Sequence, residues 1–171
     1  MKVSRTIKVT TASEAIDLLT LALPDLSKGR LKDAMNKGAL SVQKGKQHRR
    51  MRRAQAIVQP GEILHLNYDD DLLNRSCEPA ELIADEEQYS VWFKPPGMLS
   101  QGNEWGDHLA LLRHVELHFA QKRQVFLVHR LDREASGLVV IAHSKTAAAA
   151  LSLLMQNQQM HKTYHVQVRG Q

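Results

Sequence analysis

A short polar segment between two apolar runs carries the side chains with the clearest potential for chemistry. Residues 125–128 lead into it and residues 138–142 lead out. Two strand-like runs of this kind form a rigid frame for a loop. The loop contains Asp132 between Arg130 and Arg133, and neighbouring cations favour the ionised carboxylate that a nucleophile or general base requires. A surface turn with ion pairs has the same composition, and the residue types alone favour the turn.

The order of the residues in this segment distinguishes a catalytic loop from a surface turn. Residues 129–138 are His-Arg-Leu-Asp-Arg-Glu-Ala-Ser-Gly-Leu, which closely resembles the catalytic signature of the RluA-type pseudouridine synthases. In that family the Asp is the essential catalytic residue, and the resemblance assigns this role to Asp132. The protein-kinase sequence His-Arg-Asp is excluded, because Leu131 separates Arg130 from Asp132 and no Gly-rich phosphate loop precedes them.

Two further segments carry the same resemblance. Residues 94–97, Lys-Pro-Pro-Gly, resemble the family's first motif, a turn that supports the catalytic loop, so we expect a structural role for them. Tyr164 lies 32 residues after Asp132, and the alternation over residues 164–168 predicts a strand. The alternation alone favours a Tyr164 side chain that is simply buried in the core. The resemblance instead implies that Tyr164 packs against the target base and assists the chemistry.

The N-terminal part of the chain resembles an S4 RNA-binding domain. Over about residues 12–68 we predict a helix at 12–22 capped by Ser13, a helix at 28–36 capped by Ser27 and ended by Gly38, and strands at 39–42 and 63–68. The Pro-Gly-Glu turn at residues 60–62 departs mildly from the family's Gly-Asp step. From the residues alone, an RNA-binding helical hairpin of another kind is an alternative.

Positive charge is concentrated in residues 44–53, which hold six cations and no acid. A solvated loop is the usual explanation of such a run, but mutual repulsion is tolerated when the cations contact phosphate. We therefore favour nucleic-acid contact for this loop. The predicted RNA-contacting residues are Lys28, Arg30, Lys44, Lys46, Arg49, Arg50, Arg52 and Arg53, with Arg130 and Arg133 beside the candidate catalytic carboxylate.

The charge distribution also predicts the domain organisation. Residues 1–68 hold 13 Lys and Arg against 5 Asp and Glu, whereas residues 69–88 hold 1 against 8. We predict an α+β protein with an S4-like (αL) RNA-binding domain at 1–68, a solvated acidic linker at 69–80, and the first portion of a synthase catalytic domain at 81–171. Its mixed or antiparallel sheet would include strands at 82–84 and 90–93, with helices at about 108–120, capped by residues 106–107, and 145–155.

No metal or cofactor is expected. The three consecutive acids at residues 69–71 have no second set of ligands. His114 and His118 have the spacing of a zinc pair but lack a third ligand, so we expect ordinary helix residues. The single cysteine, Cys77, fits a reducing compartment. With no apolar run of membrane-spanning length and no apolar signal core, we predict a cytoplasmic protein without membrane contact.

The resemblance implies isomerisation of specific uridines in structured RNA, with ribosomal RNA favoured over tRNA. Asp132 would act as a nucleophile or as the base that removes a ribose proton, and Tyr164 would stack on the base. Arg130 would contact a phosphate or fill the space that the base leaves. The alternative function is an RNA-binding module without catalysis.

Family members continue past this point with a further Arg that pairs with the catalytic Asp and a Gly-Arg-x-His-Gln motif, neither of which precedes Gln171. We therefore expect either the N-terminal piece of a longer enzyme or a naturally shortened relative. We also expect weak or absent activity unless another chain completes the site, and self-association through an exposed sheet edge.

Overall fold

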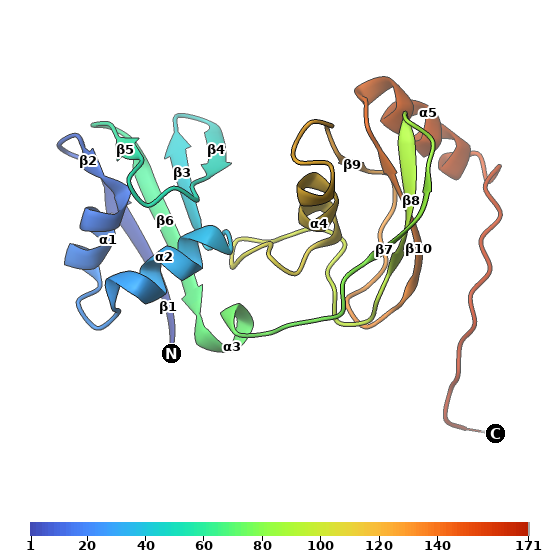
Figure 1. The fold of residues 1–171 in the computed structure, drawn as a ribbon, viewed down its shortest axis with the longest axis horizontal. Coiled ribbons are helices and arrows are strands. Elements are labelled where there is room, and N and C mark those ends of the chain that lie inside the picture. Colours follow the sequence, from blue (N-terminus) through green and yellow to red (C-terminus); the bar gives the residue numbers. More distant parts are fainter. Residues whose placement is uncertain (171) are drawn as a thin grey trace.

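The computed structural model describes residues 1–170, whose elements form two units with separate hydrophobic cores (Figure 1). The N-terminal unit contains β1 (Lys2–Lys8), β2 (Ser13–Glu14), α1 (Ala15–Ala22), α2 (Lys28–Asn36), β3 (Leu40–Lys44), β4 (Gln47–Arg50), β5 (Ile57–Val58), β6 (Ile63–Asp69) and α3 (Asp70–Leu73). The C-terminal unit contains β7 (Glu81–Asp85), β8 (Tyr89–Lys94), α4 (Leu111–His118), β9 (Phe126–Leu127), β10 (Gly137–Ala142) and α5 (Lys145–Gln156). The fold is thus a mixed α/β one with antiparallel sheets.

The N-terminal unit is built on an antiparallel sheet with strand order β1-β6-β3-β4. Apolar side chains of α1, α2, β3 and β6 form its core, in which Ile16, Leu31 and Leu64 are fully buried. The predicted helix at 28–36 is confirmed, and the Ser27 hydroxyl accepts a hydrogen bond from the Arg30 N–H at 3.3 Å. The predicted strands at 39–42 and 63–68 are confirmed as β3 and β6.

The predicted start of the first helix is wrong. Ser13 lies in β2, and α1 begins at Ala15 after Glu14, which makes no side-chain cap. The Ala15 N–H donates instead to the backbone carbonyl of residue 56 at 3.0 Å, and the Ile16 N–H donates to that of residue 54 at 3.1 Å. Carbonyls from a distant segment therefore satisfy the helix end, and no serine cap is needed.

Several strands occur where the sequence predicted none, and β1 and β4 are the longest of them. β1 pairs with β6 along its whole length. The predicted basic loop at 44–53 is largely a hairpin, because β4 pairs with β3 and Lys44 lies opposite Gln47. Gly45 takes a φ of +59° in the two-residue turn between them, a conformation that short hairpin turns require. The hairpin therefore presents its cations from a paired backbone.

The acidic connector was predicted to be a solvated linker, and its first part is not. Asp69 caps α3, accepting from the N–H groups of residues 71 and 72. Asp70 pairs with Arg30 at 2.5 Å and with the N-terminal amine at 3.1 Å. Hydrogen bonds from Tyr68 and Arg30 lower the pKa of the Asp70 carboxyl well below its usual range. These acids therefore bind the connector to the N-terminal unit.

The C-terminal unit has a second antiparallel sheet, with strand order β7-β8-β10-β9. The predicted strands at 82–84 and 90–93 and the predicted helix at 145–155 are confirmed as β7, β8 and α5. Leu111 and Val115 of α4 pack with Trp92, Val139 and Ile141 in the core. The sheet holds β9 beside β10, and therefore fixes both ends of the candidate catalytic loop.

Candidate functional site

The polar loop at residues 128–136 joins β9 to β10, as the apolar runs on either side predicted. Ile141 pairs with Leu127 and Ala142 with Phe126, so the loop spans the end of a hydrogen-bonded pair of strands. Because paired strands hold both ends of the loop, its backbone position is set by the sheet.

Hydrogen bonds clamp the backbone on both sides of Asp132. The Ser100 hydroxyl donates to the Leu131 carbonyl at 2.7 Å and accepts from the Leu131 N–H at 3.0 Å. The Arg133 carbonyl accepts from the Gly97 N–H at 2.8 Å and from Lys94 Nζ at 3.3 Å. The loop is therefore fixed at the residues immediately before and after Asp132, as a positioned catalytic group requires.

Lys94 has the supporting role that the sequence predicted for the Lys-Pro-Pro-Gly turn. Its side chain is fully buried, and Nζ also donates to the carbonyls of Pro95 and Met98, at 3.1 and 2.7 Å. Burial lowers the pKa of the Lys94 ammonium. An ammonium has three N–H donors, and Lys94 has three carbonyl partners. Lys94 therefore holds the turn and the loop together and is not exposed for chemistry.

The carboxylate of Asp132 has a different environment from the predicted one. Its side chain is exposed, and among residues 1–170 no cation lies within 4.0 Å of it. Arg133 pairs instead with Glu134, Nε to Oε1, at 2.6 Å. Arg130 is exposed as well. The predicted flanking ion pairs therefore do not form, and Asp132 is open to an incoming ligand.

His129 and Ser100 are site residues that the sequence did not single out. His129 Nε2 accepts a hydrogen bond from the Val140 N–H at 3.1 Å, which ties the start of the loop to β10. Burial, with a smaller contribution from the Lys162 charge, lowers the pKa of His129. The place of His129 in the motif could have indicated that it supports the loop. Nothing in the sequence indicated such a role for Ser100.

The predicted strand at residues 164–168 is wrong, because no strand follows α5 in residues 1–170. Tyr164 is 63% exposed, and Val166 and Val168 are more exposed still. Alternating apolar residues form a strand only where a neighbouring strand supplies hydrogen bonds, and this segment has no such neighbour within the described part of the chain. Tyr164 therefore makes no hydrogen bond to Asp132 here.

The predicted RNA-contacting cations fall into three groups. Lys44, Lys46 and Arg53 are exposed and make no ion pair with a residue in 1–170. The exposed side chains of Lys28, Arg30 and Arg49 each have a carboxylate within 4.0 Å, Asp17, Asp70 and Glu62 respectively. Arg50 and Arg52 are the least exposed and join the two units.

Asp107 is the centre of the joint between the units, and not the helix cap that the sequence predicted. Its Oδ2 accepts a hydrogen bond from Arg52 Nη2 at 2.5 Å and forms an ion pair with Arg50 Nε at 3.1 Å. Its N–H donates to the Lys37 carbonyl at 3.0 Å. Helix α4 begins at Leu111, whose N–H donates to the Leu99 carbonyl at 2.7 Å. A backbone carbonyl caps this helix too, which leaves the Asp107 side chain to the arginines.

The joint is connected to the catalytic loop through residues 99–111. One end of this segment holds Asp107 against the N-terminal unit, and its other end carries Ser100, which clamps Leu131. Burial lowers the pKa of the Arg50 guanidinium, which also donates to the carbonyls of Gly38 and Asn103. The basic hairpin and the loop that carries Asp132 are therefore connected by a continuous set of contacts.

Within the described residues no group of His, Cys, Asp and Glu could hold a metal ion. The two histidines with zinc-like spacing pack edge-on against Trp92, with ring centroids 5.5 Å (His114) and 5.0 Å (His118) from that of the tryptophan. Both rings therefore pack against a core side chain of the C-terminal unit. None of the helices in residues 1–170 has the length and apolar character that crossing a membrane requires.

Comparisons with known proteins agree with the motif at the loop. Residues 88–171 match the family model of RNA pseudouridylate synthases. The chain is 28% identical over 167 residues to an uncharacterized RNA pseudouridine synthase of Mycoplasma pneumoniae, covering 94% of this chain and 52% of that protein. It is 30% identical over 183 residues to an uncharacterized RNA pseudouridine synthase of Aquifex aeolicus, covering 99% and 56%.

A third match covers a shorter part of the chain. The tRNA pseudouridine synthase C of Pectobacterium carotovorum is 37% identical over 97 residues, which cover 55% of this chain and 25% of that protein. The chain thus spans about half the length of the two relatives that it matches along nearly its whole length.

Proposed function

We propose, from the membership of residues 88–171 in the RNA pseudouridine synthase family, that this chain isomerises uridine in RNA to pseudouridine and that Asp132 is the catalytic carboxylate. The observation that carries the proposal is the clamp, which fixes Leu131 and Arg133 and leaves the intervening carboxylate exposed. A catalytic carboxylate must be held in position and must also be accessible to a substrate as large as RNA, and a fixed backbone with an exposed side chain meets both requirements.

The reaction breaks the N1–C1′ bond of a uridine and joins C1′ to C5, and the proton on C5 is released. Asp132 would attack the ribose as a nucleophile or remove a ribose proton as a base. The target base must leave the RNA stack to reach it, at a cost of a few kcal/mol. Tyr164, exposed in the free chain, would stack on the displaced base, and Arg130 would contact a phosphate or fill the vacated space.

We assign RNA binding to the N-terminal unit, as an S4-like module. Its support is the sequence resemblance together with the exposed cations of the β3–β4 hairpin, Lys44 and Lys46, and of Arg53 after it. Phosphate contacts by these side chains would offset the cost of extruding the base. Structured ribosomal RNA is the proposed substrate. A tRNA pseudouridine synthase is among the relatives, but the match covers only 55% of this chain.

Release of tritium from RNA labelled at C5 of uridine tests the proposal, because the new C–C bond displaces that hydrogen. We expect release from ribosomal RNA, and less from tRNA. Asp132→Asn should abolish release, whereas Asp25→Asn, a change at an exposed aspartate of the N-terminal unit, should not alter it. Equal release by the Asp132→Asn variant would refute the assignment.

A non-catalytic RNA-binding module is the second candidate. It is favoured by one observation, that Asp132 and Tyr164 make no hydrogen bond to each other. RNA binding without tritium release would establish it.

A further inference from the structure

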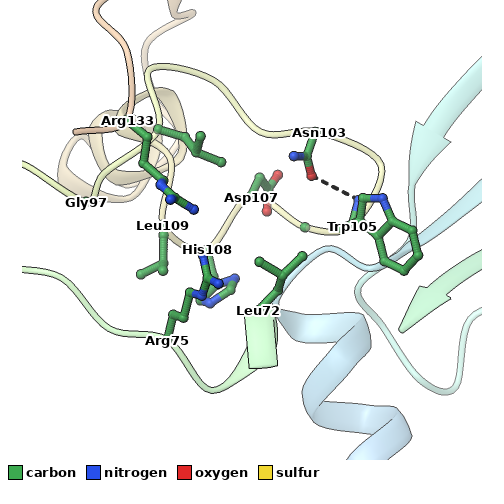
Figure 2. Close-up of a pocket in the computed structure, with 11 residues that line it drawn as sticks. Leu72, Arg75, Gly97, Asn103, Trp105, Asp107, His108, Leu109 and Arg133 are labelled. Carbon is green, nitrogen blue, oxygen red and sulfur yellow. Dashed lines mark hydrogen bonds between the residues drawn. The ribbon is translucent and has the colours of Figure 1, made fainter. Parts of the chain in front are cut away.

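A cavity of about 100 Å³ lies between the two units, beside the clamped loop (Figure 2). Leu72 of α3 and Arg75 of the connector after it line one side, and Gly97 and Arg133 line it from the C-terminal unit. Asp132 does not line it, although Arg133 is the next residue in the chain. The cavity is therefore separate from the candidate catalytic carboxylate and close to it along the backbone.

Two guanidinium groups line this cavity from opposite units. Arg75 is the only Lys or Arg in residues 54–93, and no carboxylate among residues 1–170 lies within 4.0 Å of it. Arg133 reaches the same cavity from the loop, as Figure 2 shows. The aspartate on the wall, Asp107, is bound by two other arginines through Oδ2, and its Oδ1 is buried without a partner in residues 1–170. Arg133 pairs through Nε with Glu134 at 2.6 Å, so Arg75 is the cation that brings an uncompensated charge to this space and favours binding of an anion.

The walls of the cavity are suited to a flat, partly apolar group. Leucines at positions 72, 99 and 109 lie with Trp105 and His108 along it. Both ring nitrogens of His108 are buried and have no hydrogen-bond partner in the described part of the chain. Burial lowers the pKa of His108, so its neutral ring offers one donor and one acceptor. A buried polar group without a partner costs stability until a ligand supplies one.

An anion joined to a flat ring whose edge both donates and accepts hydrogen bonds is a nucleotide. We propose that the interdomain cavity holds one unpaired nucleotide of the substrate RNA, next to the target uridine. Its phosphate lies between Arg75 and Arg133, and its base lies against Trp105 with its edge on His108. The volume is several times the 10–15 Å³ that one water needs and suits a single base. The inference rests on the proposed RNA substrate, not on the chemistry at Asp132.

Affinity for a structured ribosomal RNA fragment, measured as a function of salt, tests the phosphate contact. Arg75→Ala should weaken binding several-fold and reduce the slope of log K against log[salt] by about 0.7–0.9, the value for one phosphate. Arg5→Ala removes an exposed arginine of β1 that makes no ion pair with a residue in 1–170. It should leave both quantities unchanged. An unaltered slope for Arg75→Ala would overturn the phosphate assignment.

The base contact is tested at His108, where binding and stability should change in opposite directions. His108→Leu removes two unpaired buried nitrogens and should raise the melting temperature, while RNA affinity falls several-fold. A purely structural histidine would change stability without changing affinity. RNA should also quench Trp105 fluorescence, since the second tryptophan, Trp92, is buried in the core, and Trp105→Phe should remove that signal.

Wild-type affinity in His108→Leu together with unquenched Trp105 would overturn the nucleotide site. These measurements report binding and not turnover. A chain that binds RNA in this way but releases no tritium would retain this inference while failing the proposed function. Unaltered RNA binding by the Arg75 and His108 variants, together with tritium release that depends on Asp132, would support the proposed function and overturn this inference.

Discussion

Replacing Asp107 should separate the two units of the molecule. Asp107 Oδ2 accepts a hydrogen bond from Arg52 at 2.5 Å and forms an ion pair with Arg50 at 3.1 Å. The exposed fractions of the three side chains are 14% for Asp107, 27% for Arg50 and 23% for Arg52, so solvent screens these contacts much less than it screens surface ion pairs. In Asp107→Ala both contacts disappear, and two partly buried guanidiniums lose their counter-charge.

The expected cost follows from those two contacts. A hydrogen bond to a charged group contributes about 1.5–3 kcal/mol when water does not replace it. Both arginines keep backbone carbonyl partners, from Gly38 and Asn103 for Arg50 and from Asn36 for Arg52. Because these bonds remain, we expect each lost contact to cost an amount near the low end of that range. The total loss of stability is then about 3 kcal/mol. For a chain of this size that is a fall of about 6–12 °C in melting temperature.

Thermal unfolding measures the total cost, and amide exchange locates it. The Asp107 N–H donates to the Lys37 carbonyl across the joint, so its protection from exchange reports contact between the units directly. We expect that protection to be lost in Asp107→Ala and partly kept in Asp107→Asn, which preserves an acceptor oxygen. Asp25→Ala, an exposed control, should change stability by less than about 0.5 kcal/mol. A melting temperature within 2 °C of wild type for Asp107→Ala would refute the reasoning.

Three further changes act on the clamp. Lys94→Met removes every side-chain donor to three carbonyls and should destabilise the chain by about 2–4 kcal/mol in denaturant titrations; a loss below 0.5 kcal/mol would contradict its structural role. Ser100→Ala should cost about 1–2 kcal/mol and increase amide exchange at Leu131 selectively, an effect that uniform exchange would exclude. His129 must be neutral to accept from the Val140 N–H, and its folded-state pKa lies below the ordinary 6.5. The unfolded chain therefore binds the proton more readily, so the stability that His129 contributes is complete above pH 6.5 and is lost as the pH falls through the folded-state pKa. Titrating the His129 imidazole by NMR, with stability measured over the same range, checks this sign, and a folded-state pKa above 6.5 would reverse it.

Features set by neighbouring residues were predictable from the sequence. Ser27 caps α2 through a residue three positions away, and Gly38 ends the helix region with a φ of +84°. The loop between β9 and β10 and the Lys-Pro-Pro-Gly turn were located because each motif is continuous in the chain. Local chemistry was enough in these cases, since the partners lie within a few residues.

Features set by distant partners were not predictable in the same way. Ser13 and Asp107 had suitable positions for helix caps, but carbonyls from other segments satisfy both helix ends. Asp107 instead binds Arg52, 55 residues earlier in the chain. The run of cations led us to predict RNA contact for Arg50 and Arg52 together with their neighbours. The composition of such a run does not show which of its members an acidic residue elsewhere in the chain will bind.

The glycines at the joint limit how freely the N-terminal unit can be exchanged between proteins. A methyl group on Gly38 would overlap the Asp107 carboxylate and the Arg52 guanidinium, and one on Gly102 would overlap Asp107 itself. A chimera that receives its N-terminal unit from a relative must therefore receive Gly38, Arg50 and Arg52 with it. Grafting the unit without that set would remove the contacts that hold the two units together, so recombination between such proteins is constrained at a place away from Asp132.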